Sequence, residues 1–177
     1  TLQEDNAIRI DYDGVSDKKT VINVTNHSYF NLAGHDSGSI HDERVMIKAD
    51  GFTEILPGAI PTGRTLPVEG TPMDLRLLKR VGDEIDADFE QLTLVGGYDH
   101  NWVLDNHGDL EQIAQVEDDR SGITMEVYTD LPGVQFYAGN FITPQTGKGG
   151  VAYDKRHALC LETQYFPDAV HHPEFPQ

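Results

Sequence analysis

The sequence predicts an all-β fold, a mainly antiparallel β-sandwich that occupies residues 1–177 as a single domain. Three observations support this prediction. Apolar and polar residues alternate along much of the chain, which is the pattern of strands that bury one face. Gly, Pro, Asn and Asp recur between the alternating runs as turn signals. Only one short stretch has the apolar spacing of a helix, and many strands with almost no helix are typical of a sandwich.

The first expected element is a β-hairpin near the N-terminus. Ile8–Asp13 alternates, Gly14–Lys19 turns the chain, and Val21–Phe30 has the pattern of a second strand. Alternation along that second strand separates its residues into two faces. The apolar face holds Ile22, Val24 and Phe30, and the polar face holds Asn23, Thr25, His27 and Tyr29. We therefore expect a core-facing row and an opposite polar row.

The middle of the chain is expected to be less regular. Glu43–Ala49 predicts a strand, and Gly51–Pro72, rich in Gly, Pro and Thr, predicts loops with short extended pieces. One short helix is expected from the spacing of Leu77, Leu78, Val81 and Ile85. Trp102–Leu104 is strand-like.

The last third of the chain carries the clearest strand pattern. Asp118–Gly122 predicts a hairpin loop between Val116 and Ile123–Tyr128. In Val134–Gly139, alternation places Val134, Phe136 and Ala138 on one face and Gln135 and Tyr137 on the other. Gly147–Gly150 predicts a flexible loop. Asp168–Gln177 contains two prolines and cannot form a central strand.

Composition narrows the class of ligand. The formal net charge of −17 argues against nucleic-acid and anionic-membrane partners, which need a basic surface, and is compatible with a neutral or cationic small ligand. Cys160 is the only cysteine, so no internal disulfide can form, and we expect it to be a small core residue. No stretch is long enough to span a bilayer, and the first residues lack the pattern of a signal peptide. We therefore expect a cytoplasmic protein.

Glu162 is the strongest candidate for chemistry. It closes the apolar run Ala158–Leu161, which predicts a strand buried on both faces. A carboxylate at the end of such a strand is costly unless it is hydrogen-bonded or paired. Partial burial would also raise its pKa, which suits a general base.

Three other polar residues are candidates, each with a simpler alternative. His27 on the predicted polar face could be a satisfied structural histidine, but Asn26, Ser28 and Tyr29 surround it with groups that can orient an imidazole or bind hydroxyls. Asp99 could simply stabilise a turn by hydrogen-bonding its own backbone, or it could offer a carboxylate from a loop to sugar hydroxyls. Gln135 could be an ordinary surface residue, yet its apolar neighbours favour a partly buried binding role.

Metal and nucleophile signals are weak. His157, Asp168, His171 and His172 lack the spacing of a zinc site, and we expect no metal there. The chain has no Gly-x-Ser-x-Gly motif and no phosphate-binding Gly-x-x-x-x-Gly-Lys loop.

Four motifs resemble hallmark segments of the aldose 1-epimerases, the galactose mutarotases. In order along the chain they are Thr25–Leu32 (TNHSYFNL), Gly97–Asn101 (GYDHN), Pro132–Phe141 (PGVQFYAGNF) and Cys160–Gln164 (CLETQ), the last followed by Phe166–Val170 and His172-Pro173. Each motif alone is weak evidence, whereas four in the family's order over most of the chain are strong evidence. The resemblance implies a supersandwich with an open cleft for a free sugar.

The resemblance also implies roles for particular residues. Glu162 matches the general base, which takes the proton of the C1 hydroxyl, and His27 matches the general acid, which protonates the ring oxygen. Asp99, Gln135 and Tyr29 fall at positions that contact the sugar. The implied reaction interconverts the α and β anomers of galactose or glucose and needs no cofactor or metal.

The resemblance covers the C-terminal half of such a protein. A Gly-rich segment with a further sugar-binding His and Arg, and a final strand after the His-Pro segment, have no match here. We therefore expect a sandwich that is incomplete at both ends, with the acid–base pair present and the sugar subsite partial. The missing N-terminal half, or a second copy in a homodimer, is the expected protein partner.

Two alternatives stay open at this point. A hexose-phosphate epimerase would need an Arg or Lys cluster for the phosphate, which the acidic composition disfavours. A non-catalytic carbohydrate-binding β-sandwich needs aromatic and hydroxyl-binding groups but no matched acid and base. The presence of both His27 and Glu162 argues against it, and the loss of the N-terminal half argues for it.

Overall fold

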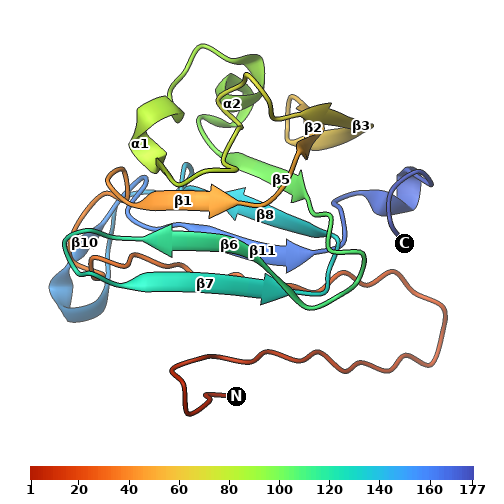
Figure 1. Ribbon diagram of the computed structural model, residues 1–177, viewed down its shortest axis with the longest axis horizontal. Coiled ribbons are helices and arrows are strands. Elements are labelled where there is room, and N and C mark those ends of the chain that lie inside the picture. Colours follow the sequence, from red (N-terminus) through yellow and green to blue (C-terminus); the bar gives the residue numbers. More distant parts are fainter.

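The computed structural model describes all of residues 1–177. Two antiparallel sheets lie face to face, two short helices lie beside one end of them, and a long N-terminal segment runs below (Figure 1). The predominance of antiparallel strands confirms the predicted all-β class.

The first sheet has four strands in the order β4-β1-β6-β7, each pair antiparallel. Its strands are β1 (Arg44–Ile47), β4 (Lys79–Arg80), β6 (Glu111–Glu117) and β7 (Thr124–Thr129). The expected strand Glu43–Ala49 is confirmed as β1. The expected hairpin around Asp118–Gly122 is confirmed as β6 and β7.

The second sheet has five strands in the order β11-β8-β5-β2-β3, also antiparallel throughout. Its strands are β2 (Gly51–Leu56), β3 (Ile60–Pro67), β5 (Asp99–Val103), β8 (Gly133–Tyr137) and β11 (Cys160–Gln164). The remaining elements are the pair β9 (Gln145–Thr146) and β10 (Ala152–Tyr153), the helices α1 (Val81–Glu84) and α2 (Glu90–Val95), and two 3₁₀ turns at Lys148–Gly150 and Ala169–His171.

The core lies between the two sheets and follows the alternation of the strands. In β8, Val134 and Phe136 are fully buried, and Ala138 just after the strand is buried as well. Gln135 and Tyr137 lie on the opposite face of β8, as the sequence predicts. The core face of the second sheet continues with Phe52, Trp102 and Leu161, which share one core cluster with Val45, Ile47, Ala114 and Val116 of the first sheet. The second sheet therefore keeps its other face for polar side chains.

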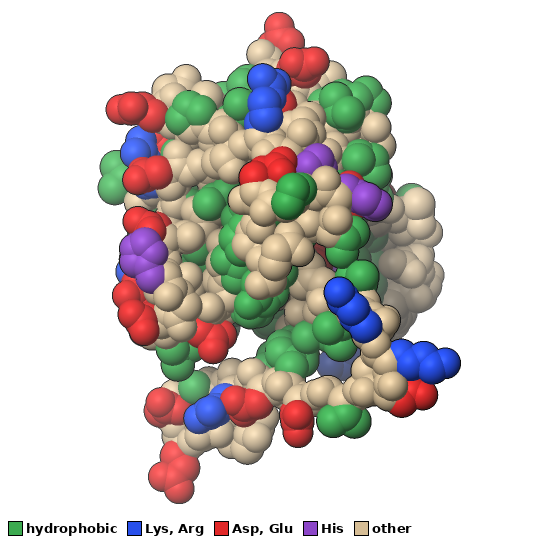
Figure 2. Space-filling view, turned by 90° about the vertical axis from the view of Figure 1, so that its right-hand side faces the viewer, with side chains coloured by type: hydrophobic (Ala, Val, Ile, Leu, Met, Phe, Trp, Pro, Cys, Tyr) green, Lys and Arg blue, Asp and Glu red, His purple; other side chains and the backbone are tan.

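The predicted N-terminal hairpin is wrong. Ile8–Asp13 and Val21–Phe30 do not pair, and residues 1–24 are exposed throughout. Alternating residues form a stable strand only where another element covers the apolar face, and here Ile8 and Ile22 stay about 70% exposed. The start of this segment stands away from the body at the bottom of the space-filling view (Figure 2), and from Asn23 onward the segment is tied back to the second sheet.

Two predictions for the middle of the chain also need correction. Most of Gly51–Pro72 forms the long hairpin β2–β3 instead of loops, and Pro61 and Pro67 in β3 are tolerated because β3 lies at the edge of the sheet. The expected helix is reduced to α1, because Leu77 and Leu78 point outward and Lys79–Arg80 pairs with β1. The sequence missed α2, whose Gln91 caps the backbone of Ile55 in β2. None of these helices has the length and apolar character that crossing a membrane requires.

Candidate active site

The register of the second sheet gathers polar side chains on its free face. Glu162 in β11 lies opposite Gln135 in β8, which lies opposite Asn101 in β5. The next row on the same face contains Asp99, Tyr137 and Cys160. These side chains share one face because residues two apart on a strand point the same way. Segments distant in the sequence are thus joined in one site by the strand order.

His27 reaches this face from a segment that runs along β11. Phe30 forms an antiparallel bridge with Leu159, and the two residues exchange backbone hydrogen bonds of 2.8 Å. Seven residues earlier in the segment, the carboxamide of Asn23 donates to the carbonyl of Tyr165 at 2.8 Å and accepts from its N–H at 3.2 Å. The antiparallel course between these two ties brings His27 across from Glu162. No strand is needed to hold His27 there.

An open cavity of ≈ 370 Å³ lies over this polar face. It contains all five residues that the sequence singled out, namely His27, Tyr29, Asp99, Gln135 and Glu162. It also contains four residues to which the sequence gave no role, namely Tyr137, Phe141, Gln164 and Pro167. Tyr137 and Gln164 each follow a predicted site residue by two positions on the same strand, so alternation was a signal that could have found both.

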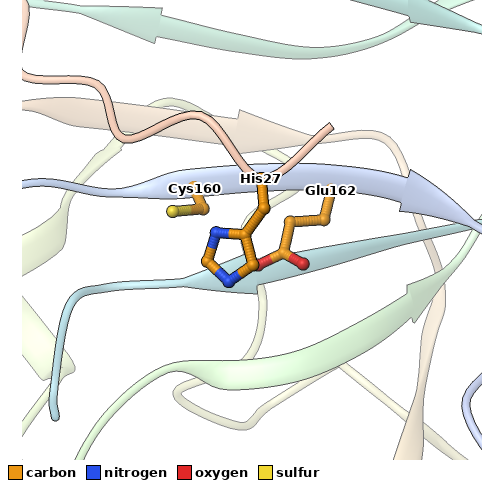
Figure 3. Close-up of side chains that lie close together, drawn as sticks. All are labelled: His27, Cys160 and Glu162. Carbon is orange, nitrogen blue, oxygen red and sulfur yellow. The ribbon is translucent and has the colours of Figure 1, made fainter. Parts of the chain in front are cut away.

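The imidazole of His27 and the carboxylate of Glu162 point toward each other (Figure 3). Nε2 of His27 lies 3.3 Å from Oε1 of Glu162. The sequence interpretation placed the two groups on opposite sides of a sugar, whereas this structure brings them into contact. A ligand that lies between the two groups must displace the imidazole, whose side chain is 50% exposed.

The carboxylates of the site are electrostatically linked. Burial raises the pKa of Glu162, the His27 imidazolium lowers it, and the Asp99 carboxylate raises it again, for a net increase. This confirms the predicted direction for Glu162. Burial likewise raises the pKa of Asp99, opposed by a hydrogen bond from Gln135 and by His27. One imidazole thus faces two carboxylates that each hold protons more tightly than in water.

Asp99 and Gln135 form a direct pair. Nε2 of Gln135 donates to Oδ1 of Asp99 at 2.8 Å. The sequence interpretation placed Asp99 on a loop, and the structure corrects this, because Asp99 is the first residue of β5. A strand holds a carboxylate more rigidly than a turn does, which suits a group that must orient a ligand.

Aromatic rings close the sides of the cavity. The ring of Tyr29 lies 5.1 Å from the imidazole of His27, and the ring of Tyr137 meets both at 6.2–6.3 Å in edge-on contacts. Phe141 stacks on Tyr137 with 6.2 Å between centroids. Rings with apolar faces and polar edges suit a ligand that has both C–H and hydroxyl surfaces.

Potential metal ligands also occur in the site. One ligand atom each of His27, Cys160 and Glu162 lies within 4.8 Å of the others. Burial, together with the charges of Glu162 and Asp99, raises the pKa of the Cys160 thiol to about 12, which disfavours the thiolate that a metal needs. Cys160 is fully buried, as predicted, but it lies on the cavity face of β11 opposite Tyr137 and not in the core between the two sheets. His171 and His172 instead both contact the carboxylate of Asp168.

Comparisons with known proteins agree on one family. A family model described as aldose 1-epimerase matches residues 1–177. Galactose mutarotase from Mus musculus is 44% identical over 168 residues, which are 94% of this chain and 48% of that protein. Aldose 1-epimerase from Escherichia coli (strain K12) is 37% identical over 177 residues, 99% of this chain and 51% of that protein. The chain thus spans about half the length of the curated relatives it matches.

Solved structures agree with the sequence comparisons. The GalM/aldose epimerase homologue from C. elegans superposes with a TM-score of 0.75 at 26% identity, covering 88% of this chain and 46% of that chain. Galactose 1-epimerase from Lactobacillus acidophilus NCFM gives a TM-score of 0.71 at 29% identity, covering 86% and 43%.

Proposed function

The chain belongs to the aldose 1-epimerase family, and from this premise we propose that it interconverts the α and β anomers of free hexoses such as galactose and glucose. The observation that carries the proposal is the contact between His27 and Glu162 inside a cavity lined by hydrogen-bonding and aromatic groups. An imidazole and a buried carboxylate are the two groups that opening a sugar ring requires.

The proposed mechanism moves one proton at each end of the breaking bond. Glu162, ionised, removes the proton of the C1 hydroxyl, while the imidazolium of His27 donates a proton to the ring oxygen. The C1–O5 bond breaks and leaves an open-chain aldehyde. The aldehyde then rotates and closes from its other face, with Glu162 now the acid and His27 the base. Each positioned proton transfer contributes about 10²–10⁴-fold to the rate.

Binding of the sugar is assigned to the remaining groups. Asp99 accepts hydrogen bonds from hydroxyls, and Gln135, which already donates to Asp99, offers further polar contacts. Tyr29, with its ring beside His27, covers an apolar face of the sugar. The acidic composition and the absence of any Lys or Arg from the cavity lining disfavour a phosphorylated substrate.

Carbohydrate binding without turnover is a second candidate function. Two observations favour it: the cavity is open and modest in volume, and the chain spans about half the length of the relatives. In that case residues 1–177 form one binding domain, and a further protein segment or a second copy of the chain would complete an active site.

A cytoplasmic location stays a prediction and is tested by cell fractionation.

Polarimetry separates the two candidates. We expect the wild-type chain to speed the mutarotation of α-D-galactose, and we expect Glu162→Gln to lower kcat by at least about 10²-fold. Glu126→Gln, which changes an exposed carboxylate on β7, is the matched control and should behave as wild type. Saturable galactose binding without any rate increase would favour the second function. Full activity in Glu162→Gln would contradict the proposed mechanism.

A further inference from the structure

A continuous line of polar side chains crosses the second sheet beneath the sugar cavity. It starts at Thr53 in β2, passes through Asn101 in β5 and Gln164 in β11, and reaches Gln135 in β8 and then Asp99. Thr53 and Asn101 are 1% and 2% exposed, and Gln164 is 8% exposed. Because Thr53, Asn101 and Gln164 are almost closed to water, their polar groups must be satisfied by neighbouring side chains, whereas Gln135 and Asp99 are only partly buried.

The direction of every hydrogen bond in the line follows from its Asp99 end. An ionised carboxylate only accepts, so the NH₂ group of Gln135 must face Oδ1 of Asp99, at 2.8 Å. Oε1 of Gln135 then faces Gln164, which must present its own NH₂ group, at 3.5 Å. The second hydrogen of that NH₂ group points to Oδ1 of Asn101 at 3.4 Å.

At the far end of the line, the hydrogen bond between Asn101 and Thr53 has the donor and acceptor that this order requires. With its Oδ1 accepting from Gln164, Asn101 donates from Nδ2 to the hydroxyl of Thr53 at 3.0 Å. Room for the Asn101 carboxamide depends on Gly133, because a Cβ atom at that position would lie 2.4 Å from Oδ1 of Asn101. The two contacts of Gln164 are long, but reversing any amide would bring two oxygens or two NH₂ groups together in a buried place.

We propose that Gln164 is a positioning residue, which fixes the amide of Gln135 so that Asp99 is held as a hydrogen-bond acceptor for a substrate hydroxyl. Oδ1 of Asp99 is occupied by Gln135, while Oδ2 has no protein donor and stays available to the ligand. The identity of that ligand as a sugar rests on the proposed function, whereas the effect of Gln164 on Asp99 does not.

Breaking this line of hydrogen bonds should change the pKa of Asp99, which can be measured without any substrate. Asp99 is surrounded by His27, Glu162, Tyr29, Tyr137 and Cys160, and the amide of Gln135 is the neighbour that donates to it directly. In Gln164→Leu the freed Gln135 amide can rotate away, so the pKa of Asp99 should rise above its wild-type value. Carbon-13 NMR titration of the Asp99 carboxyl group measures this pKa in the variant and in wild type. The matched control is Gln91→Leu, which removes another buried glutamine, in α2, that neither lines the cavity nor bonds to a member of the line, and it should leave the Asp99 pKa unchanged.

Sugar kinetics provide the second readout. Because a hydrogen bond to a charged group is worth about tenfold or more in affinity, Gln164→Leu should raise KM for galactose about tenfold and change kcat little. Gln164→Glu should raise KM further, because its carboxylate oxygens would face and repel Oε1 of Gln135 and Oδ1 of Asn101. This increase in KM should diminish at low pH, where the introduced carboxyl group is protonated. Gln91→Leu should keep the wild-type KM.

The two readouts keep the inference apart from the proposed function. An Asp99 pKa that rises in Gln164→Leu supports the inference even if the wild-type chain turns over no sugar. An Asp99 pKa in Gln164→Leu equal to that of wild type overturns the inference, whatever the kinetics. If Gln164→Leu does not fold, Thr53→Val tests the same line from its far end. It should move the Asp99 pKa in the same direction by less, and no movement there would overturn the inference equally.

Discussion

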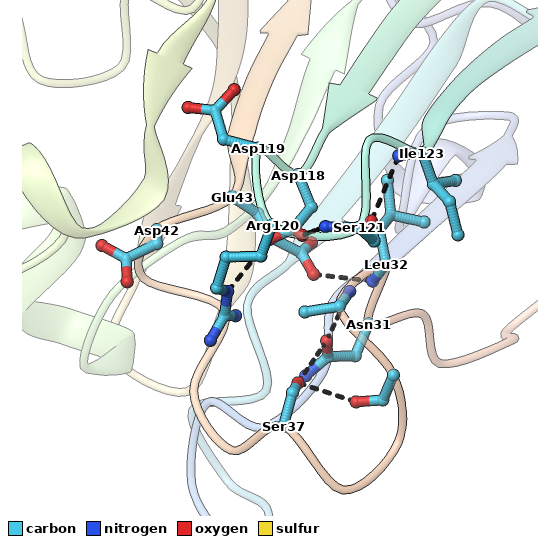
Figure 4. A network of polar contacts seen from close by, with 12 residues as sticks. Asn31, Leu32, Ser37, Asp42, Glu43, Asp118, Asp119, Arg120, Ser121 and Ile123 are labelled. Carbon is cyan, nitrogen blue, oxygen red and sulfur yellow. Dashed lines mark hydrogen bonds and ion pairs between the residues drawn. The ribbon is translucent and has the colours of Figure 1, made fainter.

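Glu43 is a buried carboxylate that the proposed mechanism does not use, and its removal should make the protein more stable at neutral pH. It precedes β1 and is 0% exposed. Oε1 accepts from the backbone N–H of Leu32 at 2.7 Å, whereas Oε2 has no hydrogen-bond partner (Figure 4). Asp118, itself 2% exposed, lies in the same network.

The magnitude follows from the pKa of this carboxyl group. Burial raises it from 4.5 to about 7; the backbone N–H groups of Leu32 and Ala33 and the Arg120 cation oppose the rise, and the charge of Asp118 adds to it. At 1.36 kcal/mol per pKa unit, ionising Glu43 in the folded state costs about 3 kcal/mol relative to the unfolded state.

The sign of the pH dependence is fixed by the direction of this shift. Below pH 4.5 Glu43 is protonated in both states and carries no penalty. As pH rises from 4.5 to about 7, the unfolded chain loses the proton first, so this group lowers the free energy of unfolding. Above that range the full penalty is present. Glu43→Gln keeps an acceptor for Leu32 and has no proton to lose, so it removes the penalty.

Urea unfolding followed by the fluorescence of Trp102, the single and fully buried tryptophan, measures the effect. Glu43→Gln and wild type should be about equally stable at pH 4, and the variant should gain up to about 3 kcal/mol by pH 8. Glu126→Gln, an exposed change, is the control and should show no such divergence. A difference between Glu43→Gln and wild type that stays constant from pH 4 to pH 8 would refute the reasoning.

Three further outcomes are expected from the packing and the contacts. Asn23→Ala removes both hydrogen bonds to Tyr165 and should lower kcat/KM in polarimetry, because a misplacement of His27 by about 1 Å can cost about 10²-fold in rate. The free energy of unfolding should stay within about 1 kcal/mol of wild type. An unchanged kcat/KM would show that these hydrogen bonds do not hold His27 in place. Phe136→Ala should cost about 3–5 kcal/mol in urea unfolding, whereas Leu77→Ala, at an 82% exposed position, should cost no more than about 0.5 kcal/mol; equal losses would contradict the assigned core. The Cys160 thiol should react with iodoacetamide only after denaturation, because it is fully buried and its pKa is raised to about 12; rapid labelling of the folded protein, read by mass spectrometry, would be inconsistent with this environment.

The sequence predicted the parts of the fold whose local pattern and tertiary surroundings agree. Val134–Gly139 alternates cleanly because β8 lies between two strands, with a core on one face and the cavity on the other. Alternation also put Gln135 and Tyr137 on the same face. The hairpin β6–β7 was predictable because its Asp-rich loop carries its own turn chemistry.

Other parts of the fold depend on contacts that no local pattern reveals. Ile8–Asp13 alternates as strongly as β8 but meets no covering sheet, so alternation alone misled the prediction. β3 contains Pro61 and Pro67, which are tolerated only because that strand is at a sheet edge, a fact of topology. α2 is short and was invisible to a search for longer periodic runs.

The candidate site was accessible mainly through the motifs, because its residues come from four separate segments. Cross-strand register joins Glu162, Gln135 and Asn101, and no spacing in the sequence states that register. The line through Gln164 was missed for the same reason, since its contacts run across strands. The roles of His27, Tyr29, Asp99, Gln135 and Glu162 in catalysis and binding stay predictions until variants are measured.

The pH dependence of kcat/KM for α-D-galactose mutarotation tests the central claim most directly, because the mechanism needs Glu162 ionised and His27 protonated at once. The profile should be bell-shaped near neutrality. Activity should fall on the acid side as Glu162 takes up a proton, at a pH above its ordinary 4.5 because burial and Asp99 outweigh His27. It should fall again on the alkaline side because the mechanism needs a protonated general acid. Glu162→Gln should abolish the acid limb together with most of the rate. A wild-type rate that rises steadily from acid to alkaline pH would contradict the account.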